Sequence, residues 1–167
     1  MAKLITGQPA PIFNLEDIHG RRIALEDFLE RTVLINFWSA ECPWSERADR
    51  ALVEWQERIV LLWIASNANE PPELLRQAAA ARGLPVVLCD SGHLVADLYG
   101  AVTTPHLFLV DAGGILRYQG AGDDVSFRQR EPTRSFIGEA IRAVLDGKLP
   151  PVAETPAYGC AIVRELV

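Results

Sequence analysis

Residues 32–46 read TVLINFWSAECPWSE. The apolar run that ends at Trp38 predicts a buried strand, and the polar run after Cys42, with Ala48 and Leu52 at helical spacing, predicts a helix. Cys42 therefore stands where a strand gives way to a helix, which is a place where a fold exposes a nucleophile. The helix N-terminus favours the thiolate and lowers the pKa of such a thiol. We take Cys42 as the candidate nucleophile.

The residue three positions after Cys42 is Ser45, where a Cys-x-x-Cys motif would carry its second cysteine. A local disulfide is therefore impossible, and the disulfide partner has to be Cys89, Cys160 or an external thiol. The Ser45 hydroxyl lies one helical turn beyond Cys42. It either donates a hydrogen bond to the Cys42 thiolate or is a solvated helix hydroxyl.

Strand and helix patterns alternate along the rest of the chain. Residues 59–65 form a second continuous apolar run, which is typical of a parallel strand covered on both faces and completes a βαβ unit. Gly83 ends a helix that opens at Pro71 and Pro72, and a turn at 111–114 joins two antiparallel strands. The expected strands are residues 10–15, 21–25, 32–38, 59–65, 86–88, 106–110 and 115–118, with a helical turn at 26–29 and helices after Cys42, after Pro72, at 94–99 and at 136–145.

The composition fits one globular domain over residues 1–167, with 49% hydrophobic and 23% charged residues. The formal net charge of -6 and the lack of a basic tract argue against binding to nucleic acid or to an anionic membrane, so we expect protein or small-molecule partners. Residues 1–11 lack the pattern of a signal peptide, and no apolar run approaches the ~20 residues of a membrane span. Together with an odd count of three cysteines, these features predict a cytoplasmic location.

The order of elements, with Thr103-Thr104-Pro105 before the hairpin and the last helix, resembles the thioredoxin fold over about residues 8–147. The implied architecture is α/β, with a central mixed sheet flanked by helices, an N-terminal β-hairpin and a C-terminal tail, residues 149–167, that packs on the domain in extended form. Residues 37–45 resemble the Phe-Trp-Ala-x-Trp-Cys-Pro-x-Cys signature of TlpA/ResA-type thiol-disulfide oxidoreductases. The chain is also similar to the peroxiredoxin-like (AhpC/TSA, redoxin) proteins that end in a Gly-Cys-x-Ile segment. That second likeness rests on residues 99–101, 104–105, 122–124, 143–148 and 159–162.

The resemblance implies a thiol-disulfide oxidoreductase or a peroxiredoxin-like antioxidant with Cys42 as its nucleophile. Its substrate would be a disulfide-bearing protein, a small thiol or a peroxide, and an external thiol such as glutathione would be the reductant. The tail is long enough to fold back, so Cys160 could resolve a sulfenic acid or mixed disulfide on Cys42, or could only pack in the tail. No cofactor or metal is expected. The alternative is a non-catalytic protein-binding or redox-sensing module with the same fold.

A second functional region surrounds Pro105. The resemblance implies a cis peptide bond between Thr104 and Pro105 beside Cys42, which would leave the Thr104 backbone free to pair with an extended peptide or thiol substrate. Trp44 could form an apolar rim that receives a substrate side chain, whereas Trp38 is expected in the core. The candidate catalytic residues are Cys42, Ser45, Pro105 and Cys160, and the candidate substrate-binding residues are Trp44, Thr104 and Pro105.

Other polar residues are expected to have structural roles. Cys89 ends a core strand and is expected to be buried, and its spacing to His93 is too weak a signal for a zinc site. His106 begins a strand and is expected to be half-exposed and not catalytic. Asp123 and Asp124 follow a glycine-containing fragment that lacks the dinucleotide fingerprint, so we expect them to bond to local backbone.

Overall fold

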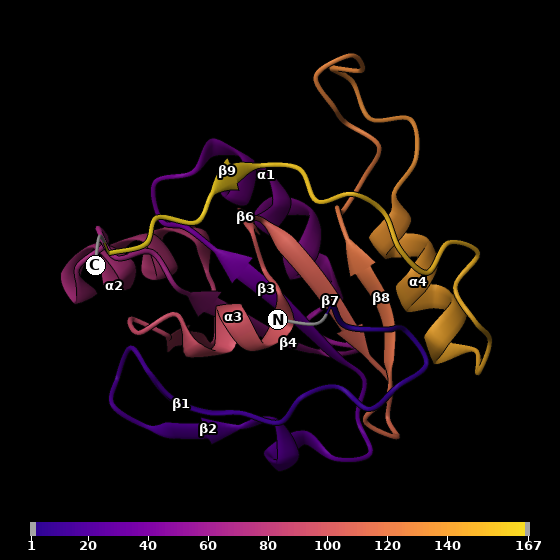
Figure 1. Ribbon diagram of the computed structural model, residues 1–167, viewed down its shortest axis with the longest axis horizontal. Coiled ribbons are helices and arrows are strands. Elements are labelled where there is room, and N and C mark those ends of the chain that lie inside the picture. Colours follow the sequence, from indigo (N-terminus) through magenta and orange to yellow (C-terminus); the bar gives the residue numbers. More distant parts are fainter. Residues whose placement is uncertain (1–2, 166–167) are drawn as a thin grey trace.

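The computed structural model describes residues 3–165, in which a seven-stranded sheet has the strand order β2-β1-β5-β4-β3-β7-β8 (Figure 1). A second, two-stranded sheet joins β6 to β9. The strands are β1 (Asn14–Asp17), β2 (Arg22–Ala24), β3 (Val33–Trp38), β4 (Val60–Ala65), β5 (Val87–Cys89), β6 (Thr103–Thr104), β7 (His106–Val110), β8 (Leu116–Gly120) and β9 (Cys160–Ala161). The helices are α1 (Pro43–Leu52), α2 (Pro72–Arg82), α3 (Leu94–Tyr99) and α4 (Phe136–Leu145), with 3-10 turns η1 (Leu25–Phe28) and η2 (Val53–Trp55).

The centre of the large sheet is the predicted βαβ unit. β3 and β4 run parallel, with Val33 opposite Val60 and Trp38 opposite Ala65, and every residue of both strands is buried. α1 connects them and begins at Pro43, where the missing N–H costs no helical hydrogen bond. β5 adds to β4 in parallel and β7 adds to β3 antiparallel, so the predicted mixed sheet of a thioredoxin-like fold is confirmed.

Helices cover both faces of this sheet. Successive side chains of β3 point to opposite faces, so Leu34 and Trp38 pack in the core under α1, α2 and α4. Ile35 and Phe37 pack in the second core, together with Tyr99 of α3 and the N-terminal segment. Because both faces of β3 pack against core residues, the end of this strand is a fixed support for the loop that carries Cys42.

Two strands of the large sheet, β1 and β8, differ from the predicted bounds by more than one residue at an end. β1 begins at Asn14, later than expected, because Pro11 has no amide hydrogen for a sheet ladder and the N–H of Ala10 bonds elsewhere, to Gly114. β8 runs further than expected, to Gly120. A side chain at Gly120 would overlap the tail backbone, so glycine there allows the tail to pass close by.

The tail crosses one end of the molecule as an extended segment, drawn in yellow in Figure 1. Within it, β9 pairs antiparallel with β6, with Cys160 opposite Thr104 and Ala161 opposite Thr103. The tail therefore packs on the domain in the extended form that the sequence predicts, but the β6–β9 pairing itself was not predicted. A long loop, residues 121–135, projects from the body between β8 and α4 (Figure 1).

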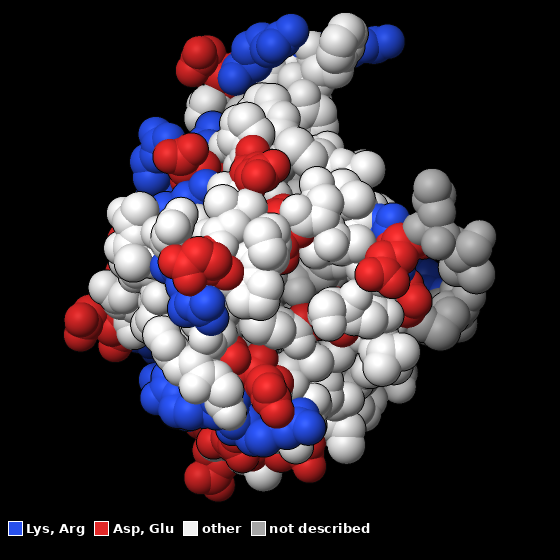
Figure 2. Space-filling view, turned by 90° about the vertical axis from the view of Figure 1, so that its left-hand side faces the viewer, with Lys and Arg blue, Asp and Glu red and all other residues white. Residues whose placement is uncertain are grey.

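The molecular surface carries charges of both signs. On the face drawn in Figure 2, acidic and basic side chains are interspersed among uncharged ones. Such mixing gives this face no basic field of the kind that attracts phosphate groups. Within residues 3–165, none of the helices has both the length and the apolar character needed to cross a bilayer.

Candidate active site

Cys42 is the N-cap of α1, and its thiol is enclosed between the β6 edge and the tail. The thiol donates a hydrogen bond to the carbonyl oxygen of Thr104, 3.1 Å away, and its Sγ lies 2.6 Å from the Sγ of Cys160. Both cysteines are free thiols, and only 3% of Cys42 is exposed. The expectation that the fold exposes this nucleophile is therefore wrong here, because β9 of the tail lies over it.

The two thiols differ in acidity. Burial acts to raise the pKa of Cys42, but hydrogen bonds from the Cys160 thiol and from the Ser45 backbone N–H outweigh it, so the pKa lies below the ordinary cysteine value. Burial, together with the hydrogen bond to Cys42 and its charge, raises the pKa of Cys160 to about 11. Cys42 is thus the thiol that ionises first, while Cys160 keeps its proton.

Ser45 acts on this site through its backbone rather than its hydroxyl. Its Oγ is fully buried and accepts a hydrogen bond from the N–H of Ser39 at 3.2 Å. Neither predicted role of the hydroxyl, thiolate donor or solvated group, is observed. The Ser45 N–H faces the Cys42 sulfur instead, because the first-turn amides of a helix have no intrahelical acceptor.

A buried carboxylate that the sequence analysis missed, Glu70, holds the loop before Cys42. Its Oε2 accepts a hydrogen bond from the Ser39 hydroxyl at 2.6 Å, and its Oε1 accepts one from the N–H of Ala40 at 2.5 Å. The Ser39 oxygen in turn accepts the N–H of Cys42 at 3.1 Å. Through this chain of hydrogen bonds, Glu70 and Ser39 fix the backbone position of Cys42.

A buried ion pair, also missed, holds the same loop from the helix side. Arg82, at the end of α2, pairs with Asp49 of α1 at 3.1 Å and donates to the carbonyl oxygen of Ser39 at 3.4 Å. Asp49 also accepts the indole N–H groups of Trp38 and Trp63, each at 2.8 Å. Burial raises the pKa of Asp49 even against these three donors. Trp38 is fully buried, as predicted.

The Thr104–Pro105 peptide bond is cis, as predicted. The backbone of Thr104, however, is not free to receive a substrate, because it pairs with Cys160 of the tail. The predicted docking edge exists, but in this structure the chain's own β9 occupies it.

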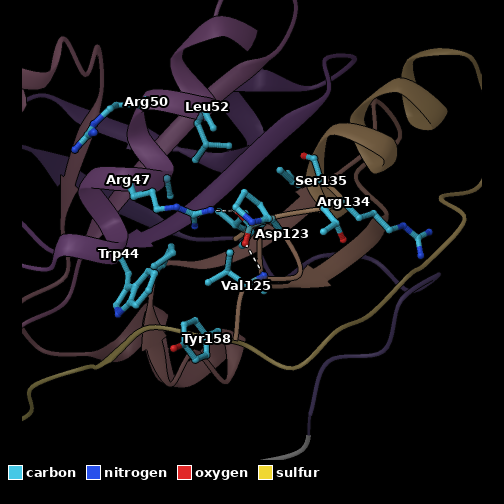
Figure 3. Close-up of a pocket in the computed structure, with 18 residues that line it drawn as sticks. Trp44, Arg47, Arg50, Leu52, Asp123, Val125, Arg134, Ser135 and Tyr158 are labelled. Atoms are coloured by element: carbon cyan, nitrogen blue, oxygen red, sulfur yellow. Dashed lines mark hydrogen bonds and ion pairs between the residues drawn. The ribbon is translucent and has the colours of Figure 1, made fainter. Parts of the chain in front are cut away.

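A pocket of about 610 Å³ is lined in part by Trp44 and Tyr158, each of which is two residues along the chain from one of the two cysteines (Figure 3). Trp44 and Tyr158 stand together on one side of it, edge to face, with ring centroids 5.1 Å apart. Arg47 and Asp123 point toward each other across the pocket and form an ion pair at 2.6 Å. Pro105 also lines this space, so the predicted rim residue Trp44 borders a cavity that it shares with the cis-proline.

Comparison with known proteins agrees with this geometry. The sequence model of the AhpC/TSA family matches residues 6–119, which include the strand, the cysteine, the helix and the cis-proline just described. The chain belongs to the AhpC/TSA family. Its peroxiredoxin-like, thioredoxin-family resemblance is thereby confirmed.

Curated relatives of this AhpC/TSA chain are thiol-disulfide oxidoreductases. "Thiol-disulfide oxidoreductase ResA" of Halalkalibacterium halodurans is 35% identical over 114 residues, which are 65% of this chain and 64% of that protein, a little under two thirds of its length. The protein of the same name from Bacillus thuringiensis (strain Al Hakam) is 29% identical over 156 residues, 90% of this chain and 80% of the relative. Both relatives are named for exchange between thiols and disulfides, and the part of the first relative that this chain matches falls short of two thirds of that protein.

Solved structures confirm the fold of the AhpC/TSA chain over almost its full length. A hypothetical protein from Sinorhizobium meliloti 1021 superposes with a TM-score of 0.87 at 27% identity, covering 99% of this chain and 98% of that one. An uncharacterized conserved protein from Geobacillus kaustophilus gives 0.86 at 26% identity, with 98% and 94% covered. The thioredoxin domain of a thiol-disulfide oxidoreductase from Bacteroides vulgatus gives 0.62 at 23% identity, with 77% and 94% covered.

The other polar residues for which the sequence predicts structural roles in this family member lie away from the two sulfur atoms or are held by local contacts. His106 is buried rather than half-exposed, because its ring stacks on Phe108 and its Nδ1 accepts the N–H of Val102, and burial lowers its pKa to about 4. Cys89 is half-buried rather than fully buried as expected, because it is the last residue of the short strand β5, and the partial burial raises its pKa. Asp123 and Asp124 bond to local backbone as predicted, and Asp123 also pairs with Arg47. Within the described part of the chain, no three His, Cys, Asp or Glu side chains are grouped to hold a metal ion.

Proposed function

We propose that this chain is a thiol-disulfide oxidoreductase whose working redox couple is Cys42 and Cys160. The observation that carries the proposal is the 2.6 Å separation of the two sulfur atoms, which come from positions far apart in the sequence. A disulfide bond needs a separation of about 2.05 Å, so only a small movement joins them. Cys160 thus takes the part that the second cysteine of a Cys-x-x-Cys motif would play at Ser45.

The chemistry is two successive thiol-disulfide exchanges. The Cys42 thiolate attacks one sulfur of a substrate disulfide, a Cys42–substrate bond forms, and the other substrate sulfur leaves as a thiolate and takes up a proton. The Cys160 thiolate then attacks Cys42 Sγ and releases the first substrate sulfur. The substrate gains two electrons and two protons, and an external thiol reductant returns the Cys42–Cys160 disulfide to the dithiol.

The acidity of the pair sets the order of these steps. While Cys42 is a thiolate, its hydrogen bond and its charge help hold the pKa of Cys160 at about 11. Once Cys42 enters a mixed disulfide, the hydrogen bond to its thiolate and its negative charge both disappear. Cys160 therefore becomes easier to ionise at the moment when its attack is required.

This ordering predicts the reactivity of Cys160 in a Cys42→Ala variant. Without the neighbouring thiolate, the pKa of Cys160 is expected to fall from about 11 toward the ordinary cysteine value, because two of the causes that raise it are removed. The measurement is the pH dependence of iodoacetamide labelling at Cys160, read by peptide mass so that Cys89 is counted separately. An unchanged or higher apparent pKa would show that the two thiols are not coupled.

The direct test of the redox couple is oxidation followed by mapping. Fully reduced chain receives one equivalent of oxidised glutathione or, separately, of hydrogen peroxide, free thiols are blocked, and cysteines are assigned by intact and peptide mass without reduction. The expected product is an intramolecular Cys42–Cys160 disulfide with Cys89 free. A lasting glutathione adduct or sulfenic acid on Cys42 alone would show that an external thiol, rather than Cys160, reacts with Cys42 in the second step. An unreacted Cys42 would leave the non-catalytic binding module as the better account.

A further inference from the structure

The tail is bound to the domain as a β-strand along a specific strip. Beyond the β6–β9 pairing, the N–H of Ile162 bonds to the carbonyl oxygen of Val102 at 3.1 Å. The N–H of Val163 bonds to the side-chain oxygen of Asn67 at 2.8 Å, and the Val163 carbonyl accepts the N–H of Ala68 at 2.9 Å. Backbone groups therefore account for most of these contacts, and any extended polypeptide could make them.

The side chains on either side of Cys160 occupy two separate apolar sites. Two residues before it, Tyr158 lines the pocket of Figure 3 and packs on Trp44. Two residues after it, Ile162 is buried in the core cluster on the α3 side of the sheet. Because side chains alternate along a strand, an aromatic and an aliphatic residue placed two positions from a cysteine fit this strip together.

Gly159 permits the close approach of the tail to the cis-proline loop. A Cβ atom at Gly159 would overlap the carbonyl group of Thr104 and come within 3.1 Å of Pro105 Cδ. The residue just before the cysteine of any occupant therefore has to be glycine, because even the Cβ atom of alanine would overlap the Thr104 backbone. The strip thus selects the pattern aromatic, glycine, cysteine, any residue, aliphatic.

We propose that the strip covered by residues 158–163 is the docking surface for the polypeptide substrate, and that the tail is a resident copy of that substrate which has to leave. The inference rests on the proposed function. With only 3% of Cys42 exposed, a polypeptide disulfide reaches the sulfur only after the tail departs. The substrate that replaces the tail is an extended segment carrying a disulfide-bonded cysteine, with an aromatic residue two positions before it and an aliphatic residue two positions after it.

Substrate and tail then exchange places during one turnover. Docking of the substrate segment puts its sulfur where Cys160 Sγ lies, and attack by Cys42 forms the mixed disulfide with release of the other substrate sulfur as a thiol. The returning tail competes for the same β6 edge, delivers the Cys160 thiolate to Cys42 Sγ and displaces the reduced segment. The return of the tail therefore does two things at once: it breaks the mixed disulfide between Cys42 and the substrate, and it displaces the reduced substrate from the β6 edge.

The test uses the full chain with Cys160→Ser and Cys89→Ser, so that Cys42 is its one thiol. The probe is a synthetic peptide that copies residues 154–163, its cysteine joined to 5-thio-2-nitrobenzoate, whose release reports attack by Cys42. The matched peptide carries Tyr158→Ala and Ile162→Ala, and a small aromatic disulfide reports the intrinsic reactivity of the thiol. The copy is expected to react at least about tenfold faster than the matched peptide, because only the copy fills both apolar sites.

Opening the strip gives the second arm of the test. Adding Gly159→Ala is expected to weaken tail docking and to raise the rate with the copy peptide, whereas Gly92→Ala, where a Cβ meets nothing closer than 3.8 Å, is expected to leave it unchanged. Equal rates for both peptides, or a dimer in which a second copy's tail fills the strip, would overturn the docking proposal. Failure of the small disulfide as well would instead count against the proposed function.

Discussion

Replacing Cys42 by serine is expected to abolish disulfide reduction, with a loss of at least about a thousandfold. A serine hydroxyl does not ionise near neutral pH and cannot form the mixed disulfide. Cys160 does not substitute for it, because it lies on the tail and lacks the α1 N-terminal amides that favour the Cys42 thiolate. The measurement is the rate of reduction of a small disulfide with excess dithiol as reductant.

The matched control for this variant is Cys89→Ser. Cys89 lies at the end of β5, half-buried and with a raised pKa, and takes no part in the Cys42–Cys160 contact, so turnover is expected to stay within about twofold of the wild type. Turnover that survives Cys42→Ser would place the nucleophile elsewhere. A wild-type chain without turnover, whose partner binding survives Cys42→Ser, would instead favour the non-catalytic module.

The elements of the large sheet could be predicted because their signals are local. The apolar runs of β3 and β4 are long and continuous, and the regular stripe of α4 fixes its bounds at Phe136–Leu145. β6 and β9 have only two residues each, so neither carries a period that a sequence pattern could reveal. Their pairing depends on the tail returning over the domain, which is a tertiary event.

The same distinction separates the predicted from the missed parts of the site. Cys42 and Pro105 stand in recognisable motifs, whereas the burial of Cys42 results from the distant tail. Arg82 looks like an ordinary cation in the last turn of a helix, and Asp49 looks like part of the polar face of α1. Only the packed structure shows that two indole N–H groups converge on Asp49, because Trp38 and Trp63 belong to neighbouring strands.

Replacing Asp49 by alanine is expected to lower the free energy of unfolding by about 3–5 kcal/mol. The change leaves the Arg82 guanidinium and the two buried indole N–H groups of Trp38 and Trp63 without their common acceptor, and each uncompensated group costs stability. Since a domain of this kind typically has about 5–15 kcal/mol in total, the variant is expected to be close to unfolding at ambient temperature. Urea denaturation followed by tryptophan fluorescence and circular dichroism measures the loss.

Two further variants show how much of the stability lost in Asp49→Ala comes from the buried hydrogen bonds and how much from the loss of a negative charge. Glu73→Ala removes a carboxylate whose partner, Arg76, lies 3.0 Å away on the exposed face of α2, so it is expected to cost about 1 kcal/mol or less. Asp49→Asn keeps one carbonyl acceptor and loses the charge, and is expected to fall between the two. If Asp49→Ala cost no more than Glu73→Ala, Arg82 would be held by the loop carbonyls alone. The loop before Cys42 would then owe its position to Glu70 rather than to the ion pair, because Glu70 binds the same loop through Ser39 and Ala40.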